Sequence, residues 1–175
     1  PKWFFFASTS HVYKPTIKFK KISETCKTNP QNKYGTTKLI TENFLKKLSK
    51  KHGIKVCIGR IFSFTDIKQK TPYVIPTIIK KMKSFQKKIT LKNLNNFRDF
   101  LNTKDIVSAL EILRKKNAVG VYNIGSGISF DLRNVAKLFS KKYNKKVNFK
   151  NLLKDSFLIS NNKKIKKLGW KPSKF

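Results

Sequence analysis

Cysteine, glycine and acidic side chains are scarce in this chain of 175 residues. The two cysteines, Cys26 and Cys57, form no Cys-x-x-Cys pair and no Cys/His cluster, so neither a disulfide framework nor a metal site is expected. Cys57 lies in the apolar run 54–61 and is predicted to be a reduced, buried thiol. No apolar stretch approaches the roughly 18 residues of a membrane span. We therefore expect no membrane association and a cytoplasmic, reducing setting.

Acidic residues number only 8 against 41 Lys+Arg, which gives a formal net charge of +33. Such a charge invites an assignment to nucleic-acid binding. However, 37 of these cations are Lys and only 4 are Arg, the residue whose planar fork reads phosphates and base edges. Because the lysines are spread along the whole chain, we interpret them as a solvated surface and expect no specific nucleic-acid partner. A cationic module that binds nucleic acids or anionic surfaces remains an alternative.

Apolar periodicity predicts strands that alternate with helices. Short apolar runs predict strands at 3–8, 54–62, 89–91, 119–124 and 147–149, with an extended piece at 97–101. Helical spacing predicts helices at 34–51, 74–85, 103–114, 131–143 and 160–168. This alternation is typical of an α/β fold with a mainly parallel sheet.

Several helix boundaries and one buried face can also be read from the sequence. In the first helix, an apolar stripe is formed by Leu39, Ile40, Phe44, Leu45 and Leu48, and Gly53 stands where a C-terminal cap belongs. Thr103 is the expected N-cap of the third helix, and Asp131 or Ser129 that of the fourth.

A tyrosine and a lysine four residues apart carry the strongest chemical signal. In Tyr34-Gly-Thr-Thr-Lys38, this spacing places both side chains on one helical face. A phenol, with an ordinary pKa of about 10, is a poor base at neutral pH, but a nearby ammonium favours its phenolate form. Thr9 or Ser8, at the carboxyl end of the first strand, could then orient a substrate oxygen, because ligands bind at that end of parallel strands.

The segments around this pair follow one another in a recognisable order. They are Ser8-Thr9-Ser-His-Val-Tyr13, Tyr34-Gly-x-x-Lys38, Arg60-Ile-Phe62, Arg98-Asp-Phe-Leu-x-x-Lys-Asp105, Tyr122-Asn-Ile-Gly-Ser-Gly127 and Leu168-Gly-Trp-Lys-Pro172. Together they resemble the extended short-chain dehydrogenase/reductases of the NAD-dependent epimerase/dehydratase family. That family includes nucleotide-sugar epimerases, 4-keto-6-deoxy-hexose reductases and GDP-mannose 4,6-dehydratase relatives.

The resemblance implies a role for each matching residue. Tyr34 would be the catalytic acid/base, Lys38 would bind the nicotinamide ribose, and Thr9 would orient the sugar oxygen. Tyr34, Lys38 and Ser8 would contact the cofactor, NAD or NADP. Thr9, Ser63 and Arg98 would contact the substrate, a nucleotide-diphosphate sugar, with Arg98 at its phosphates. Hydride transfer at a sugar carbon is the implied reaction, by an epimerase or a reductase, and a homodimer is the expected assembly.

The same resemblance implies a division of the chain. Residues 1–70 would be the C-terminal half of the Rossmann-like, doubly wound NAD(P)-binding domain and would hold the catalytic residues. Residues 71–175 would form mainly a small mixed α/β lobe for the nucleotide sugar, with segments at about 98–125 returning to the Rossmann sheet. Asn123 and Asp105 are expected to fix loops around the site.

Three departures from the family pattern affect these expectations. Ser10 and His11 stand where the dehydratases carry an acidic residue, which disfavours 4,6-dehydration, although His11 could substitute as a base. Ser63 replaces an asparagine and Asp66 a glycine, which leaves an inactive remnant as another alternative. No glycine precedes Gly35, so the phosphate-binding fingerprint of the N-terminal half is absent. We expect this chain alone to bind NAD(P) weakly and to expose an apolar sheet edge.

Overall fold

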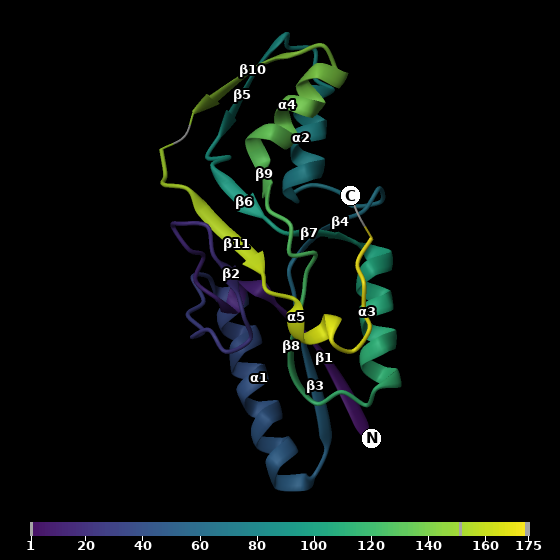
Figure 1. Ribbon diagram of the computed structural model, residues 1–175. Coiled ribbons are helices and arrows are strands. Elements are labelled where there is room, and N and C mark those ends of the chain that lie inside the picture. The colour runs from purple at the N-terminus through teal and green to yellow at the C-terminus, as the bar shows by residue number, and fades with distance from the viewer. Residues whose placement is uncertain (1, 151, 174–175) are drawn as a thin grey trace.

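A three-stranded parallel sheet forms the base of the molecule in a computed structural model that describes residues 2–150 and 152–173 (Figure 1). The strands are β1 (Trp3–Thr9), β3 (Lys55–Ile61) and β8 (Gly120–Ile124), in the order β1-β3-β8. Phe5 pairs with Cys57, and Cys57 pairs in turn with Gly120. Among the described residues, β1 therefore lies at an edge of this sheet, as expected, and its Phe4 is exposed.

Helices pack on both sides of this sheet (Figure 1). α1 (Lys33–His52) contacts β1 and β3. On the other side, α3 (Thr103–Lys115) and the short α5 (Lys163–Lys166) enclose an apolar core with the strands. That core includes Cys57, which is fully buried and forms no disulfide, so the predicted reduced, buried thiol is confirmed; burial raises the pKa of this thiol to about 12.

A second, smaller group of elements lies above the carboxyl ends of these strands (Figure 1). It contains α2 (Val74–Met82), α4 (Leu132–Lys142) and the parallel pair β5 (Lys88–Lys92) and β10 (Lys146–Lys150). Their apolar faces share a separate core, in which Ile78, Met82, Ile89 and Ala136 are buried. The two helices and the parallel strand pair thus form a lobe that lies over one end of the sheet.

Short strands join the two parts. One sheet has the order β2-β11-β6-β9 and consists of β2 (Lys21–Ile22), β11 (Ser156–Ser160), β6 (Asn96–Arg98) and β9 (Phe130–Asp131). Another pairs β4 (Ser63–Thr65) with β7 (Phe100–Asn102). A 3₁₀ turn, η1 (Ser10–Val12), follows β1 directly. The α/β class with parallel strands, predicted from the alternation of elements, is confirmed.

Two predicted helix features are wrong. The predicted helix 160–168 is reduced to Lys163–Lys166; Ser160 instead ends β11, which pairs with β2 and β6, and Asn161 N donates to the carbonyl oxygen of Ile22 in β2. Thr103 is not the cap of α3: the side chain of Asn102 accepts the capping bond from Asp105 N, and the Thr103 hydroxyl donates to Asp66. The predicted caps Gly53 and Asp131 are confirmed.

The predicted apolar stripe of α1 is only partly buried. Ile40 and Phe44 are exposed, whereas Leu39 and Leu45 are half-buried. The most deeply buried side chain of the helix is instead that of Glu42. Its carboxylate is balanced by a buried cation on β3, which local periodicity does not reveal.

Candidate active site

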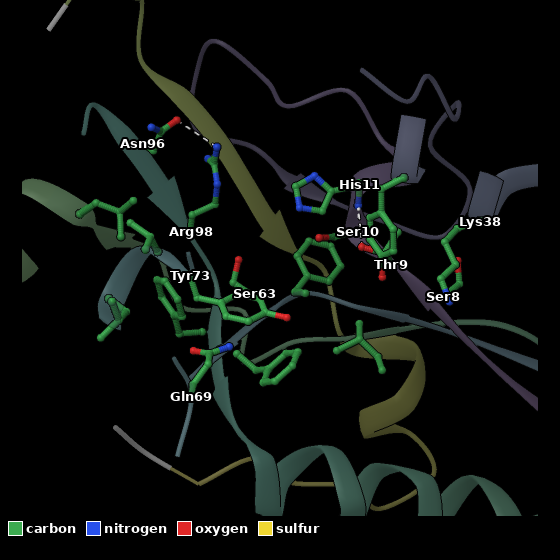
Figure 2. Close-up of a pocket in the computed structure, with 18 of the residues that line it drawn as sticks. Ser8, Thr9, Ser10, His11, Lys38, Ser63, Gln69, Tyr73, Asn96 and Arg98 are labelled. Carbon is green, nitrogen blue, oxygen red and sulfur yellow. Dashed lines mark hydrogen bonds between the residues drawn. The ribbon is translucent and has the colours of Figure 1, made fainter. Parts of the chain in front are cut away.

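A cavity of about 790 Å³ opens where the lobe meets the carboxyl ends of the parallel strands (Figure 2). This volume suits a ligand of the size of a nucleotide or larger. Its wall combines apolar side chains with polar ones from widely separated segments: Ser8, Thr9, Ser10, His11, Tyr34, Lys38, Ser63, Gln69, Asn96 and Arg98. All six residues that the sequence nominates for the site, Thr9, Ser8, Tyr34, Lys38, Ser63 and Arg98, therefore line one cavity.

The N-terminus of α1 presents Tyr34 and Lys38 to this cavity. The side chain of Asn32 caps the helix by accepting a hydrogen bond from Gly35 N at 2.8 Å. Lys38 Nζ donates to the carbonyl oxygen of Ala7 at 2.9 Å and lies 5.8 Å from the centre of the Tyr34 ring. The ammonium is thus held near the phenol by the end of β1, as the four-residue spacing predicts.

Thr9 and Ser8 stand at the same strand end but face different partners. Thr9 ends β1, and its Oγ1 accepts a hydrogen bond of 3.2 Å from the backbone N–H of His11. That bond leaves the Thr9 hydroxyl proton for an oxygen in the cavity. The Ser8 hydroxyl donates instead to Glu42 at 2.5 Å. Ser8 therefore borders the cavity while its hydroxyl is engaged beneath it.

His11 projects into the cavity from the turn after β1 (Figure 2). The centre of its ring lies 6.2 Å from that of Tyr34, and its Nδ1 lies 3.4 Å from the side-chain nitrogen of Asn32. Partial burial and then the positive charge of Arg98 lower the pKa of His11 from 6.5. The imidazole is consequently neutral at pH 7 and able to accept a proton.

Arg98 lines the cavity on the side away from Lys38, and His11 lies between the two in the view of Figure 2. Its guanidinium donates to neutral oxygens only, those of Phe97, Ser156 and Asn96. Within residues 2–150 and 152–173 it forms no ion pair, and burial lowers its pKa to about 10. A partly buried guanidinium without a counter-ion favours an anionic ligand.

Asp99 and Asp105, the acids nearest to Arg98 in the sequence, are engaged elsewhere. Asp99 accepts hydrogen bonds from Ser126, Gly127 and Ser160, and Asp105 accepts two from Ser173. Asn123 is buried and bonded to Tyr13, to Glu24 and to a backbone carbonyl. Asn123 thus holds the segment after β1, in agreement with the prediction, whereas Asp105 holds the C-terminal segment at Ser173, which does not line the cavity.

The segment that follows β3 borders two hollows. Ser63 and Gln69 line the cavity. Asp66 does not; it lines a neighbouring hollow, where it accepts hydrogen bonds from Lys68 N and Thr103, the two main causes of its lowered pKa. The carboxylate of Asp66 is thus turned toward α3 and away from Arg98.

Sequence reasoning missed Glu42, which lies four residues beyond Lys38. The repeated spacing Tyr34, Lys38, Glu42 places all three on one helical face and could have revealed it. In the described part of the chain, no group of three or more His, Cys, Asp or Glu side chains is arranged to hold a metal ion. No helix there is long and apolar enough to cross a membrane.

Comparison with known sequences finds a family model that covers almost the whole chain. The model described as GDP-mannose 4,6 dehydratase matches residues 1–174. A UDP-glucose 4-epimerase of Streptococcus mutans is 25% identical over 98% of this chain and 59% of its own length. A dTDP-D-glucose 4,6-dehydratase of Dictyostelium discoideum is 33% identical over 62% of this chain and 25% of its own. The chain thus spans well under two thirds of these relatives.

Comparison with solved structures finds the same fold. The protein RMD of Pseudomonas aeruginosa, complexed with NADPH, has a TM-score of 0.85 at 22% identity and is matched over 99% of this chain and 62% of its own. The dTDP-glucose 4,6-dehydratase DesIV of Streptomyces venezuelae, with NAD and TYD bound, has a TM-score of 0.87 at 19% identity, over 99% and 56%. These neighbours have Rossmann-type α/β folds.

Proposed function

The chain belongs to the GDP-mannose 4,6 dehydratase family, and from that premise we propose that it carries the catalytic and sugar-nucleotide part of an NAD(P)-dependent nucleotide-sugar epimerase or reductase. The observation that carries this proposal is the meeting of Tyr34, Lys38 and Thr9 at one wall of a cavity whose opposite wall holds Arg98. The known activities of the relatives, epimerases and dehydratases that act on nucleotide sugars, support the same class.

The side chains present suit a nicotinamide cofactor at the α1 wall. Lys38 and Tyr34 offer an ammonium and a phenol to a ribose, and two structural neighbours carry NADPH or NAD. When bound, such a cofactor supplies the acceptor or donor of hydride. No described residue of the cavity wall is a glycine, so this wall contains no glycine-rich loop for the pyrophosphate of the cofactor.

The chain's own residues would move the proton and orient the sugar. Tyr34 takes the proton of the sugar hydroxyl as its carbon loses hydride, and returns it in the reverse step. Thr9 donates a hydrogen bond to the same oxygen and fixes its distance from the phenol. Arg98 binds the diphosphate on the far side, so that the sugar lies between the two walls.

A single substitution tests the role of Tyr34 in the full-length protein. With a panel of nucleotide sugars and both NAD and NADP, we expect Tyr34→Phe to lower turnover by at least about 100-fold. The Tyr34 side chain is 54% exposed, so the unfolding temperature should stay within about 2 °C. Turnover that survives in Tyr34→Phe would contradict the proposal. The alternative of a cationic binding module predicts no turnover in the wild type and no effect of Tyr34→Phe on the binding of nucleic acid.

Elimination of water from the sugar is a second candidate, favoured by the position of His11 in the cavity. A neutral imidazole can take the proton next to a keto carbon and return it to the departing hydroxyl, so that water leaves and the atoms balance. The mass of the product discriminates the reactions. An epimer keeps the mass of the substrate, a dehydrated product loses one water, and a reduced product gains two hydrogens at the expense of NAD(P)H.

A further inference from the structure

Glu42 is a fully buried carboxylate that is hydrogen-bonded to Ser8, a residue of the cavity wall. It follows Lys38 by four residues and Tyr34 by eight, and therefore lies on the same face of α1. Helical side chains point back toward the N-terminus of their helix, which directs Glu42 toward the end where Tyr34 stands. A buried charge on the face that carries the proposed acid/base requires a physical explanation.

Three elements meet at this carboxylate. Ser8 of β1 donates its hydroxyl proton to Oε1 at 2.5 Å. Arg60 of β3 donates from Nε at 3.0 Å and from a terminal nitrogen at 2.6 Å, in a two-point contact. Burial lowers the pKa of Arg60, but the bonds to Glu42 and Tyr13 outweigh burial and raise it above the ordinary value. Glu42 thus ties α1 to both strands at their carboxyl ends.

The hydrogen-bonded chain continues to the third strand of the sheet. Another terminal nitrogen of Arg60 donates to the Tyr13 hydroxyl at 2.7 Å, and that hydroxyl donates to Asn123 of β8 at 2.8 Å. Tyr13, Arg60 and Asn123 are each less than 4% exposed. Every strand of the parallel sheet is therefore linked to Glu42 through a continuous buried network.

Two adjacent residues of β1 are held by two adjacent turns of α1. Lys38 binds the carbonyl oxygen of Ala7 at 2.9 Å, and Glu42 accepts from Ser8 at 2.5 Å. Thr9 is the next residue of the strand, and Tyr34 lies one turn before Lys38. The distance between the Thr9 hydroxyl and the Tyr34 phenol is consequently set by this pair of contacts.

We propose that Glu42 is a positioning residue for the hydride-transfer reaction, acting through Ser8 and Arg60 to fix α1 and its Tyr34 against Thr9. The inference rests on the proposed function for its catalytic readout. A buried ion pair is a weak source of stability, since well-packed apolar residues usually stabilise as much. The exposed Lys46, 3.7 Å from Glu42, does not explain the buried contacts.

Two variants of the full-length protein separate positioning from stability. Glu42→Leu/Arg60→Met replaces both charges by apolar groups, which avoids leaving one charge buried alone. Ser8→Ala removes one hydroxyl and keeps the ion pair. Since small displacements of reacting groups cost up to about 100-fold, we expect kcat to fall about 100-fold in the double variant and about 10-fold in Ser8→Ala. KM for the nucleotide sugar should stay within about 2-fold, because Arg98 is untouched.

Lys46→Gln is the matched control, since it removes an ion pair to the same carboxylate but none of the buried contacts. Its kcat, KM and pH profile of kcat should equal those of the wild type, whereas the pH profile should shift in the double variant. Wild-type kcat in a folded double variant overturns the proposal. If the double variant does not fold, Ser8→Ala serves as the test, and an unchanged kcat in Ser8→Ala overturns the proposal.

A measurement that does not depend on activity distinguishes failure of the positioning role of Glu42 from failure of the proposed function. Amide hydrogen exchange over residues 33–42 should be faster in Ser8→Ala and in the double variant than in the wild type, and unchanged in Lys46→Gln. If the wild-type protein turns over no nucleotide sugar, the proposed function is refuted. The amide exchange rates then still test whether Glu42 positions α1. Exchange that is the same in all variants overturns the role of Glu42.

Discussion

At the residue scale, Arg98 is the group that we expect to govern substrate affinity. Its guanidinium is partly buried in the cavity wall with only neutral partners, and this burial lowers its pKa to about 10. An incoming diphosphate would supply the missing negative charge. We expect Arg98→Gln to raise KM for the nucleotide sugar about 10- to 100-fold, since a hydrogen bond to a charged group contributes about 1.5–3 kcal/mol. Steady-state kinetics measure this change.

The exposed Arg114 of α3 provides the control for that substitution. Arg114→Gln removes the same charge from the molecule but nothing from the cavity, so KM should not change. An equal rise of KM in both variants would assign the effect to net charge. An unchanged KM in Arg98→Gln would contradict a diphosphate site at Arg98.

His11 makes a pH-dependent contribution to stability whose sign follows from its pKa. The pKa of the folded state is lowered from 6.5 by partial burial and by Arg98, so the unfolded chain binds the proton first as the pH falls. The wild type should lose stability below pH 6.5, until the pH has passed the lowered pKa. The unfolding temperature, measured between about pH 7.5 and 5, should fall less in His11→Gln.

His52, the other histidine of the chain, supplies the comparison. It is exposed at the C-terminal end of α1, away from the cavity wall, so His52→Gln is the matched control for the loss of an imidazole. Identical curves for the wild type and His11→Gln would show that the His11 imidazole is not perturbed by the cavity wall.

At this scale, the sequence predicts those residues whose chemistry depends on local spacing. Tyr34 and Lys38 are found together because four residues separate them on one helix. Glu42 has the same spacing, yet its counter-ion Arg60 comes from another element, and a lone acidic residue on a lysine-rich helix resembles a solvated one. Only the packing of α1 on β1 and β3 brings Glu42 to Ser8 and Arg60.

At the scale of elements, the close contact between α1 and the turn after β1 depends on Gly35. A Cβ at this position would collide with the carbonyl oxygen of His11 and would come within 3.0 Å of Pro30. We expect Gly35→Ala to separate α1 from this turn and to destabilise the fold by about 1–3 kcal/mol, or roughly 2–10 °C in unfolding temperature. Turnover should fall with it, because Tyr34 and Thr9 move apart.

Gly53, at the other end of α1, is a control for the loss of glycine as such. It has φ +67° and no atom within 4 Å of an added Cβ. Gly53→Ala should therefore destabilise the fold only through the left-handed backbone conformation, by about 1 kcal/mol. Its kcat should be that of the wild type. Loss of activity in both variants would indicate a general effect of helix stability and would contradict the role given to Gly35.

Elements whose partners lie close in sequence are predicted better than elements paired at long range. The cap at Gly53 and the helices 33–52 and 132–142 follow from local patterns. β11 does not, because the short run Ser156–Ser160 becomes a strand by pairing with β2 and β6, which come from distant parts of the chain. The same pairing leaves only four helical residues, Lys163–Lys166, of the predicted helix.

At the scale of the whole molecule, the fold class follows from the alternation of elements, whereas the cavity requires the tertiary structure. Polar side chains from β1, α1, β4 and β6 reach one volume because the lobe of α2 and α4 lies over the strand ends (Figure 1). The family resemblance places these residues in one site, and the structure brings all of them to its wall. Composition by itself, with a net charge of +33, points instead to a nucleic-acid-binding protein.

The surplus of positive charge gives a prediction for the intact chain. Among residues 2–150 and 152–173, only three pairs of oppositely charged side chains lie within ion-pair distance, and one of these pairs is buried. Most lysines therefore repel one another across the surface, which destabilises the compact state. Screening shortens the range of this repulsion from about 30 Å at 0.01 M salt to about 8 Å at 0.15 M. We expect the unfolding temperature to rise by several degrees over this interval.

The salt response also distinguishes an enzyme surface from a nucleic-acid interface. The same chain should bind DNA without sequence preference, and the logarithm of its affinity should fall linearly with the logarithm of salt concentration. Neither the salt dependence nor the affinity should change in Tyr34→Phe or Arg98→Gln, because these side chains lie in the cavity and the lysines do not depend on them. Calorimetric unfolding in NaCl and titration with duplex DNA measure the two quantities. An unfolding temperature that falls with salt would contradict net repulsion among the lysines. DNA binding that is lost in Arg98→Gln would show that the cavity wall takes part in binding nucleic acid.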